Sequence, residues 1–221
     1  MVVVGEGETD LVLIAMHLDE QLGDRPLPFN EMEIIAFYHP EEETRMLVGK
    51  AIVRQALRSK EPGERKAAKF SYVSTEPRYH LEAREDAGKA LCGMIRDAKA
   101  WEKSYSIAID GRYPMETRDM AASDFLDNSN QDGCIAAILG CAGISEKLRD
   151  DKGFMIVREA MERGDRALIE KLGAVGGLPR MLEVCVRSIV GPHARKPPFA
   201  KEAGPEQQDF RRWIGNGQGK K

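Results

Sequence analysis

Three basic residues, Lys50, Arg54 and Arg58, recur at every fourth position of the stretch RMLVGKAIVRQALRSK. On a helix this spacing places them on one ridge, because positions four apart lie above one another on the same face. Cations bind the phosphates of a nucleic acid, and flat aromatic rings stack on its unpaired bases. The pattern therefore predicts a surface for single-stranded nucleic acid, with RNA favoured over DNA. The residues expected to form it are Lys50, Arg54, Arg58, Lys60, Arg65, Lys66, Lys69, Phe70 and Tyr72.

The charge of the chain is segregated along its length, although the formal net charge is -3. Residues 1–44 contain eleven acidic residues and one basic residue, whereas residues 45–69 contain eight basic and two acidic ones. Residues 187–221 again carry an excess of basic residues, eight against three. A polyanion responds to such local clusters rather than to the total charge. The alternative interpretation of the first cluster is a solvated helix face whose cations pair with the acidic residues 41–43.

Residues suited to acid–base or metal chemistry are few and scattered. The four histidines do not occur at the spacing of metal ligands, and the sequence contains neither a G-x-S-x-G nor an H-E-x-x-H motif. His39, Glu82 and Asp110 are the best catalytic candidates, because each lies near the end of an expected element. We favour a simpler interpretation, in which all three are exposed polar residues at turns without a catalytic role. We therefore expect no metal or cofactor, and a role other than that of an enzyme.

The elements that position these residues are predicted to be mainly α-helical. Residues 1–115 are expected to form a mixed α/β lobe that carries the basic ridge. Helix caps, and acidic residues placed ahead of basic ones, mark the ends of its helices. The predicted helices cover residues 9–23, 41–60 and 80–103, the last ending near Trp101.

Strands are predicted in the same lobe from β-branched and aromatic residues. The segment AAKFSYVST (67–75) and the segment SYSIAID (104–110) have this composition. In the first of them, a strand would place Phe70 and Tyr72 at alternate positions on one face. Residues 32–40 also resemble a strand, although they could equally begin a helix. The N-terminal lobe is therefore expected to contain a small α+β portion.

Residues 116–190 are predicted to form a helical lobe of short helices separated by glycines. The segment CIAAILGCA (134–142) is apolar on all sides, as a central buried helix would be. No internal repeat occurs at a fixed period. Four widely spaced cysteines, without a C-x-x-C pair, indicate reduced and buried thiols in an intracellular, cytoplasmic protein. The longest apolar run, residues 133–144, is about half of what a membrane span needs.

Residues 191–221 are predicted to form an extended, proline-linked basic arm. Near its end, Phe210 and Trp213 are three positions apart and would share one face of a short helix, with Arg211 and Arg212 beside them. A helix of this length is marginal in water on its own, so we expect it to form by docking its aromatic residues. The acidic N-terminal part of a neighbouring subunit is the expected partner of the two arginines. The arm is thus predicted to mediate self-association.

Together these features favour a self-assembling RNA-binding structural protein. Viral nucleocapsid and coat proteins follow a similar plan, with a basic groove for the nucleic acid and an arm that joins subunits; such a protein would also be found in a virion. The comparison rests on this plan and on no shared motif. The first alternative is a non-catalytic subunit of a larger cellular complex, with its opposite charges facing protein partners. The second is a small metal-dependent enzyme built around His39 and Asp110.

Overall fold

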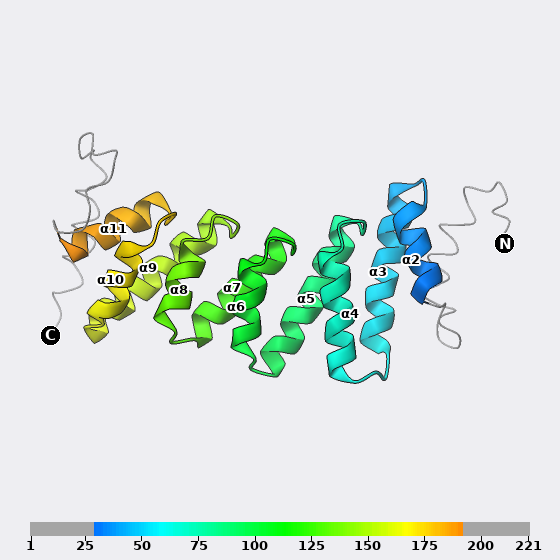
Figure 1. Cartoon of the computed structure of the whole chain (residues 1–221), viewed down its shortest axis with the longest axis horizontal. Coiled ribbons are helices and arrows are strands. Elements are labelled where there is room, and N and C mark those ends of the chain that lie inside the picture. The colour runs from blue at the N-terminus through cyan, green and yellow to red at the C-terminus, as the bar shows by residue number, and fades with distance from the viewer. Residues whose placement is uncertain (1–28, 192–221) are drawn as a thin grey trace. The chain divides into compact units, whose positions relative to one another are not determined.

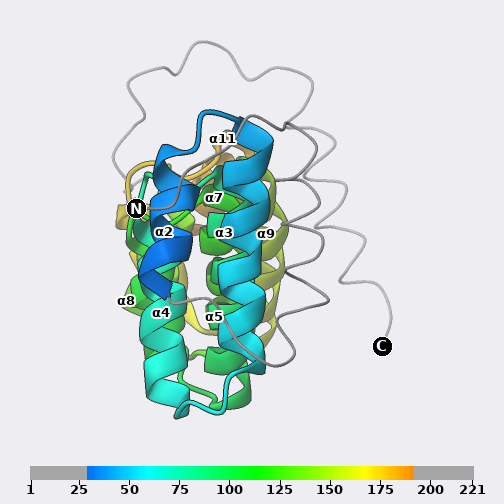
Figure 2. The ribbon, with the colours of Figure 1, turned by 90° about the vertical axis from the view of Figure 1, so that its right-hand side faces the viewer.

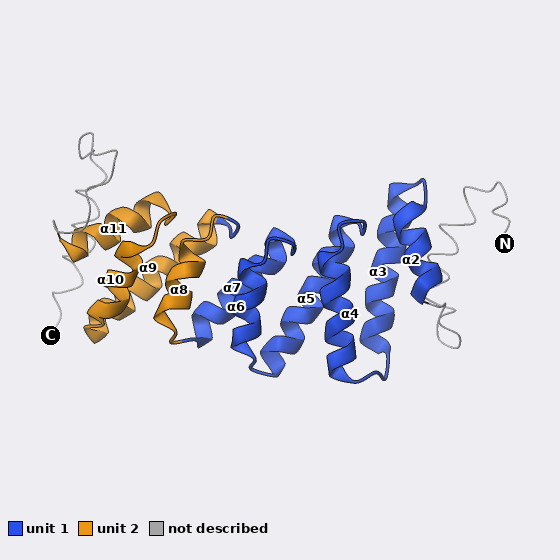
Figure 3. Ribbon diagram, viewed as in Figure 1, with its two compact units in different colours: residues 1–129, 143–145 blue, residues 130–142, 146–221 orange. Residues whose placement is uncertain are grey.

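The structure, a computed structural model, describes residues 29–191 of the chain. These residues contain ten α-helices and no strand (Figure 1). The prediction of a mainly α-helical protein is therefore confirmed. The helix expected over residues 9–23, and all of the predicted C-terminal arm except Gly191, lie outside the described residues. The chain divides into two compact units, which are coloured separately in Figure 3.

The first unit comprises the described residues 29–129 and 143–145. It is a row of three helix hairpins, in which α2 pairs with α3, α4 with α5, and α6 with α7 (Figure 1). The second helices of successive hairpins, α3, α5 and α7, also pack against one another. The helices of this unit are α2 (Phe29–Tyr38), α3 (Glu42–Arg58), α4 (Gly63–Thr75), α5 (Leu81–Asp97), α6 (Trp101–Ile109) and α7 (Met115–Asn128).

The second unit comprises the described residues 130–142 and 146–191. Helix α8 packs against α9 and α10, and α11 packs against α9 and α10. Ile138 and Leu139 of α8 are fully buried, as expected for the apolar segment 134–142. The prediction that this part of the chain is helical is confirmed, although α9 is long and contains Gly153 in its interior. Its helices are α8 (Asp132–Leu139), α9 (Glu146–Arg163), α10 (Arg166–Ala174) and α11 (Arg180–Val190).

The strands predicted near the N-terminus were wrong. Residues 67–75 lie in α4, and residues 104–110 lie almost entirely in α6. In α4 the buried residues are Phe70, Val73 and Ser74, a spacing of three and four that suits a helix rather than a sheet. Burial of one helical face thus outweighs the β-propensity of the aromatic and branched residues. Residues 32–38 likewise belong to α2, so the described residues contain no α+β portion.

The long helix predicted over residues 80–103 is interrupted. Helix α5 ends at Asp97, and Lys99 adopts a φ of 52°, in the left-handed region that a continuous helix of L-residues cannot include. Trp101 therefore begins α6 instead of ending α5.

A short motif recurs in helices α3, α5, α7 and α9. An arginine is followed four positions later by glycine or alanine, and both lie on the same side of the helix. The spacing between copies shortens along the chain, which is why the sequence shows no fixed period. The arginines are Arg45, Arg84, Arg118 and Arg149, and the small residues are Gly49, Gly88, Ala122 and Gly153.

The glycines of this motif allow the second helices to approach closely. A Cβ atom added at Gly49 would lie 2.7 Å from Ala83 Cβ, and one added at Gly88 would lie 2.0 Å from Thr117 Oγ1. In the second unit, a Cβ atom at Gly153 would lie 2.3 Å from Leu182 Cδ2. These contacts are between α3 and α5, α5 and α7, and α9 and α11. A side chain at Gly49 or Gly88 would therefore push neighbouring helices apart, and one at Gly153 would require Leu182 to move.

The arginines of the motif bind carbonyl groups at the end of the preceding helix. Arg84 Nε donates to Ser74 O at 3.0 Å, and Arg118 Nε donates to Ala108 O at 3.0 Å. Arg149 Nη1 donates to Leu139 O at 3.3 Å. Carbonyls in a last helical turn lack intrahelical partners, and this end of the helix dipole favours a cation. The arginines thus stabilise the end of the first helix in each of these hairpins.

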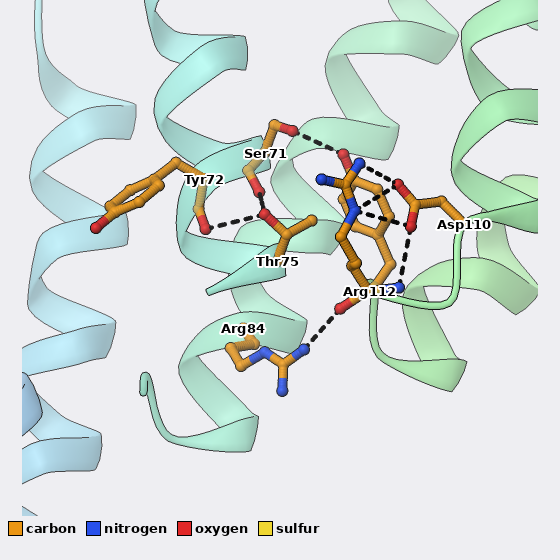
Figure 4. Close-up of polar contacts among 7 residues, drawn as sticks. Ser71, Tyr72, Thr75, Arg84, Asp110 and Arg112 are labelled. Carbon is orange, nitrogen blue, oxygen red and sulfur yellow. Dashed lines mark hydrogen bonds and ion pairs between the residues drawn. The ribbon is translucent and has the colours of Figure 1, made fainter. Parts of the chain in front are cut away.

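Two of these arginines also reach forward along the chain. Arg84 Nη2 donates to Arg112 O at 2.7 Å, a contact drawn in Figure 4, and Arg149 Nη1 donates to Gly177 O at 2.7 Å. Arg112 lies in the loop between α6 and α7, and Gly177 lies in the loop between α10 and α11. Each arginine therefore links its own helix both to the helix before it and to the loop that joins the next two helices. The stacked hairpins of the first unit therefore have a helical-repeat architecture.

The four cysteines are free thiols, and they differ in burial. Burial raises the pKa of Cys92 and of Cys185 to about 11, whereas Cys134 and Cys141 are half-buried. At pH 8 only about one thiol in a thousand with such a pKa is ionised, and the thiolate is the reactive form. We expect iodoacetamide to label Cys134 and Cys141 of the native protein well before Cys92 and Cys185, as followed by peptide mass spectrometry. Equal labelling rates for all four would contradict the described packing, and urea-unfolded protein provides the control.

Candidate nucleic-acid interface

The predicted basic ridge lies along helix α3. Lys50, Arg54 and Arg58 occupy successive turns of this helix, and Arg54 and Arg58 are exposed. Lys50 is different, because its ammonium group forms an ion pair with Glu82 at the start of α5. This ion pair lowers the pKa of the Glu82 carboxyl, through the hydrogen bond first and the charge second. The ridge therefore contains two exposed arginines and a lysine that forms an ion pair with another helix.

Further cations gather where α3 is connected to α4. We call residues 54–69, which lead from the first hairpin into the second, the hairpin tip. Figure 2 shows the connection between α3 and α4 at the lower end of both helices. The tip contains six basic and two acidic residues, a net charge of +4. Lys60 and Arg65 are exposed, and Lys66 Nζ donates to Leu57 O at 3.1 Å. Lys69 is paired with Glu61 at 2.7 Å, so its charge is largely compensated.

The start of helix α4 adds to the positive potential of the hairpin tip. Arg65 and Lys66 lie in the first turn of α4, which carries the positive end of the helix dipole. Cations are unfavourable at this end of a helix, and Glu64 is the one acidic residue in the same turn. A bound anion would be attracted both by these cations and by the positive end of the helix dipole, and would offset the repulsion between them. The tip is therefore suited to hold a phosphate group.

The two predicted stacking residues differ sharply in exposure. Phe70 is 1% exposed and belongs to the core, so it presents no ring face to a base. Tyr72 is 40% exposed, and Figure 4 shows its ring pointing away from the polar contacts around Asp110 and Arg112. Its ring lies edge-on to Tyr79 at 6.2 Å, and burial, followed by a hydrogen bond to Glu33, raises its pKa. Since the two side chains are two positions apart on a helix, they cannot share one face.

The three catalytic candidates each have a local structural partner. His39 Nδ1 accepts a hydrogen bond from Glu41 N at 3.2 Å, and Asp110 accepts one from Arg112 N at 3.0 Å. The Arg112 guanidinium lies 2.6 Å from Asp110 Oδ2 and lowers the pKa of that carboxyl (Figure 4). Glu82 pairs with Lys50 as described above. Among residues 29–191, no group of three or more histidine, cysteine or acidic side chains is placed to hold a metal ion.

Sequence reasoning missed the arginines that bond neighbouring helices to one another. Arg84, Arg118 and Arg149 lie in ordinary helical sequence, and each bonds to carbonyl groups that a charge count cannot reveal. The signal that could have found them is the repeated spacing of arginine and a small residue four positions later. The predicted oligomerisation residues lie outside the described part of the chain. They are Phe210, Arg211, Arg212 and Trp213.

Comparisons of the chain with protein-family models, with curated proteins and with solved structures gave no match. Within the part of the chain that the structure describes, none of the helices has the length and apolar content needed to cross a membrane.

Proposed function

We propose that this protein is a self-assembling structural protein that binds single-stranded nucleic acid, RNA in preference to DNA, in the manner of a nucleocapsid or coat protein. The observation that carries the proposal is the hairpin tip, with a net charge of +4 at the positive end of helix α4. Arg58, Lys60 and Arg65 are exposed there and can meet phosphate oxygens without rearrangement of the helices. Guanidinium groups suit this role because they bind phosphate through two parallel hydrogen bonds.

Recognition in this arrangement depends on the backbone of the nucleic acid. Cations that meet phosphates supply affinity without reading sequence. Of the two aromatic residues first assigned to the surface, Tyr72 alone has an exposed ring, and it lies two turns along α4 from Lys66. Stacking on bases is therefore a small contribution. We expect binding with little sequence preference and a strong dependence on salt.

Salt dependence provides the test of the hairpin tip. Each phosphate contact on a single strand contributes about -0.7 to the slope of log K against log salt, so five contacts give roughly -3.5. We expect the double variant Arg58→Ala, Arg65→Ala to flatten this slope by about 1.4. Fluorescence anisotropy with labelled oligouridine and oligothymidine, between 50 and 300 mM KCl as a workable range, measures it.

The matched control removes two arginines elsewhere. Arg158 and Arg163 are exposed on α9, and their double alanine variant changes the net charge by the same amount. This control should keep the slope of the wild type. Equal slopes in both double variants would remove the hairpin tip from the binding surface.

A non-catalytic subunit of a larger complex is the second candidate. The observation that favours it is the row of helix hairpins in the first unit, since stacked hairpins present extended surfaces to protein partners. The two functions differ in a simple measurement on freshly purified protein. A nucleocapsid-like protein carries nucleic acid and raises the absorbance at 260 nm relative to 280 nm, whereas a subunit of a protein complex does not.

A further inference from the structure

The outer face of helix α2 exposes two large apolar side chains. Ile34 is 60% exposed and Tyr38 is 69% exposed, and they are one turn apart on the helix. Glu31 lies one turn before Ile34 on the same face and is also exposed. Single exposed apolar residues are common, but a pair at helical spacing presents a continuous apolar strip.

The strip belongs to a well-anchored part of the first unit. Beneath it, the Phe37 ring lies 4.7 Å from the Tyr79 ring, and the Arg78 guanidinium stacks over Phe37 at 4.2 Å. Arg78 is held in turn by Glu76 at 2.8 Å, and Tyr79 Oη donates to Glu33 Oε1 at 3.0 Å. These contacts tie α2 to the loop between α4 and α5. Ile34 and Tyr38 are therefore exposed on a helix that is fixed in place.

Carboxylates follow the strip along the chain. Glu41, Glu42 and Glu43 are exposed in the connection to α3 and in the first turn of that helix. Figure 2 shows the α2–α3 connection at the upper end of α3, opposite the hairpin tip. The residues that fit an apolar strip with an acidic rim are aromatic side chains flanked by cations. Phe210, Arg211, Arg212 and Trp213 supply this combination within one short stretch of the chain.

We infer that residues 204–221 of one copy dock on the outer face of α2 in a second copy. Phe210 and Trp213 cover Ile34 and Tyr38, and the two arginines meet the acidic rim. The docking segment follows the second unit in the chain, whereas α2 opens the described part of the first unit. Contacts between unlike surfaces of successive copies build open chains or rings. This inference rests on the proposed self-assembly but not on nucleic-acid binding.

Two assembly-defective variants test the docking. The first lacks residues 204–221, and the second carries Ile34→Ala and Tyr38→Ala at exposed positions. Because Tyr38 also contacts Phe37 and Arg78, circular dichroism must show that the second variant keeps its fold. After nuclease treatment, analytical ultracentrifugation should show assemblies for the wild type and monomers for each variant alone. The association constant should fall on the order of 30-fold or more in each case, as for central interface residues.

Mixing the two variants provides the decisive measurement. One retains the α2 surface and the other retains the docking segment, so an equimolar mixture should form a dimer that cannot grow further. If the mixture contained only monomers, the inference would be overturned, and the segment would instead dock within its own chain. Unchanged assembly of the Ile34→Ala, Tyr38→Ala variant would overturn it as well. If residues 9–23 of the same chain covered α2 instead, that variant would lose stability but would still assemble. This result would likewise overturn the docking.

Failure of the proposed function gives a different pattern. A monomeric wild type would exclude self-assembly itself, together with the docking. The hairpin-tip variant Arg58→Ala, Arg65→Ala should assemble as the wild type does, because the tip lies at the other end of α3. Normal assembly without nucleic-acid binding would therefore refute the proposed ligand and leave the docking supported.

Discussion

Replacing Arg149 by methionine is expected to lower the free energy of unfolding of the second unit by roughly 2–3 kcal/mol. Arg149 is 8% exposed, and its Nη1 atom donates to Leu139 O and to Gly177 O. Methionine keeps most of the apolar stem but leaves both carbonyl groups without this cationic donor. Hydrogen–deuterium exchange of peptides from α8 to α11 measures the change, because it reports opening of this unit alone.

Arg158 on the same helix provides the control for this substitution. Arg158 is exposed, so Arg158→Met should change protection of the same peptides by less than about 0.5 kcal/mol. Equal effects of the two substitutions would show that Arg149 stabilises the unit no more than a surface arginine does. The junction between hairpins would then depend on apolar packing alone.

Alanine at Gly88 is expected to destabilise the first unit by roughly 2–3 kcal/mol, whereas alanine at Gly93 should stabilise it by about 0.5–1 kcal/mol. Both glycines lie in helix α5, where alanine is the better helix former. A Cβ atom at Gly88 would lie 2.0 Å from Thr117 Oγ1, whereas one at Gly93 would meet no atom within 4 Å. Urea unfolding followed by circular dichroism distinguishes the two signs.

Thr117→Ala should restore part of the stability that Gly88→Ala removes. Thr117 Oγ1 is buried without a hydrogen-bond partner among the described residues, so its loss costs little by itself. Recovery stays partial, because Thr117 Cβ would still lie 2.8 Å from the new Cβ atom. Additive effects of the two substitutions would contradict the proposed contact between α5 and α7.

The sequence predicted the helices best where apolar and charged residues alternate with helical period. Helix α3 was expected because acidic residues precede basic ones, and the short helices of the second unit because glycines separate them. Helices α4 and α6 were mistaken for strands, since their aromatic and β-branched residues match both patterns over a short window. Packing against α5 and α7 resolves that ambiguity, and these partners are distant in sequence.

The candidate site was predictable in position but not in detail. Helical spacing placed Arg54 and Arg58 on one side of α3, as the structure shows. The pairing of Lys50 with Glu82 was not predictable, because the glutamate comes from another hairpin. The burial of Phe70 followed from the helix that replaced the expected strand. A charge pattern therefore locates a surface, whereas the ion pairs of its cations are known only once the neighbouring helices are placed.

The arginine links lie at one edge of the first unit. Arg45 bonds to His39 O between α2 and α3, and Arg84 bonds to Arg112 O between α6 and α7. The opposite edge, with the connections 59–62 and 98–100, carries no such link from these arginines. Loops that make no hydrogen bonds between helices tolerate insertions and substitutions. Evolution can therefore alter the length and charge of the hairpin tip while the row of hairpins persists, so this surface can diverge faster than the scaffold.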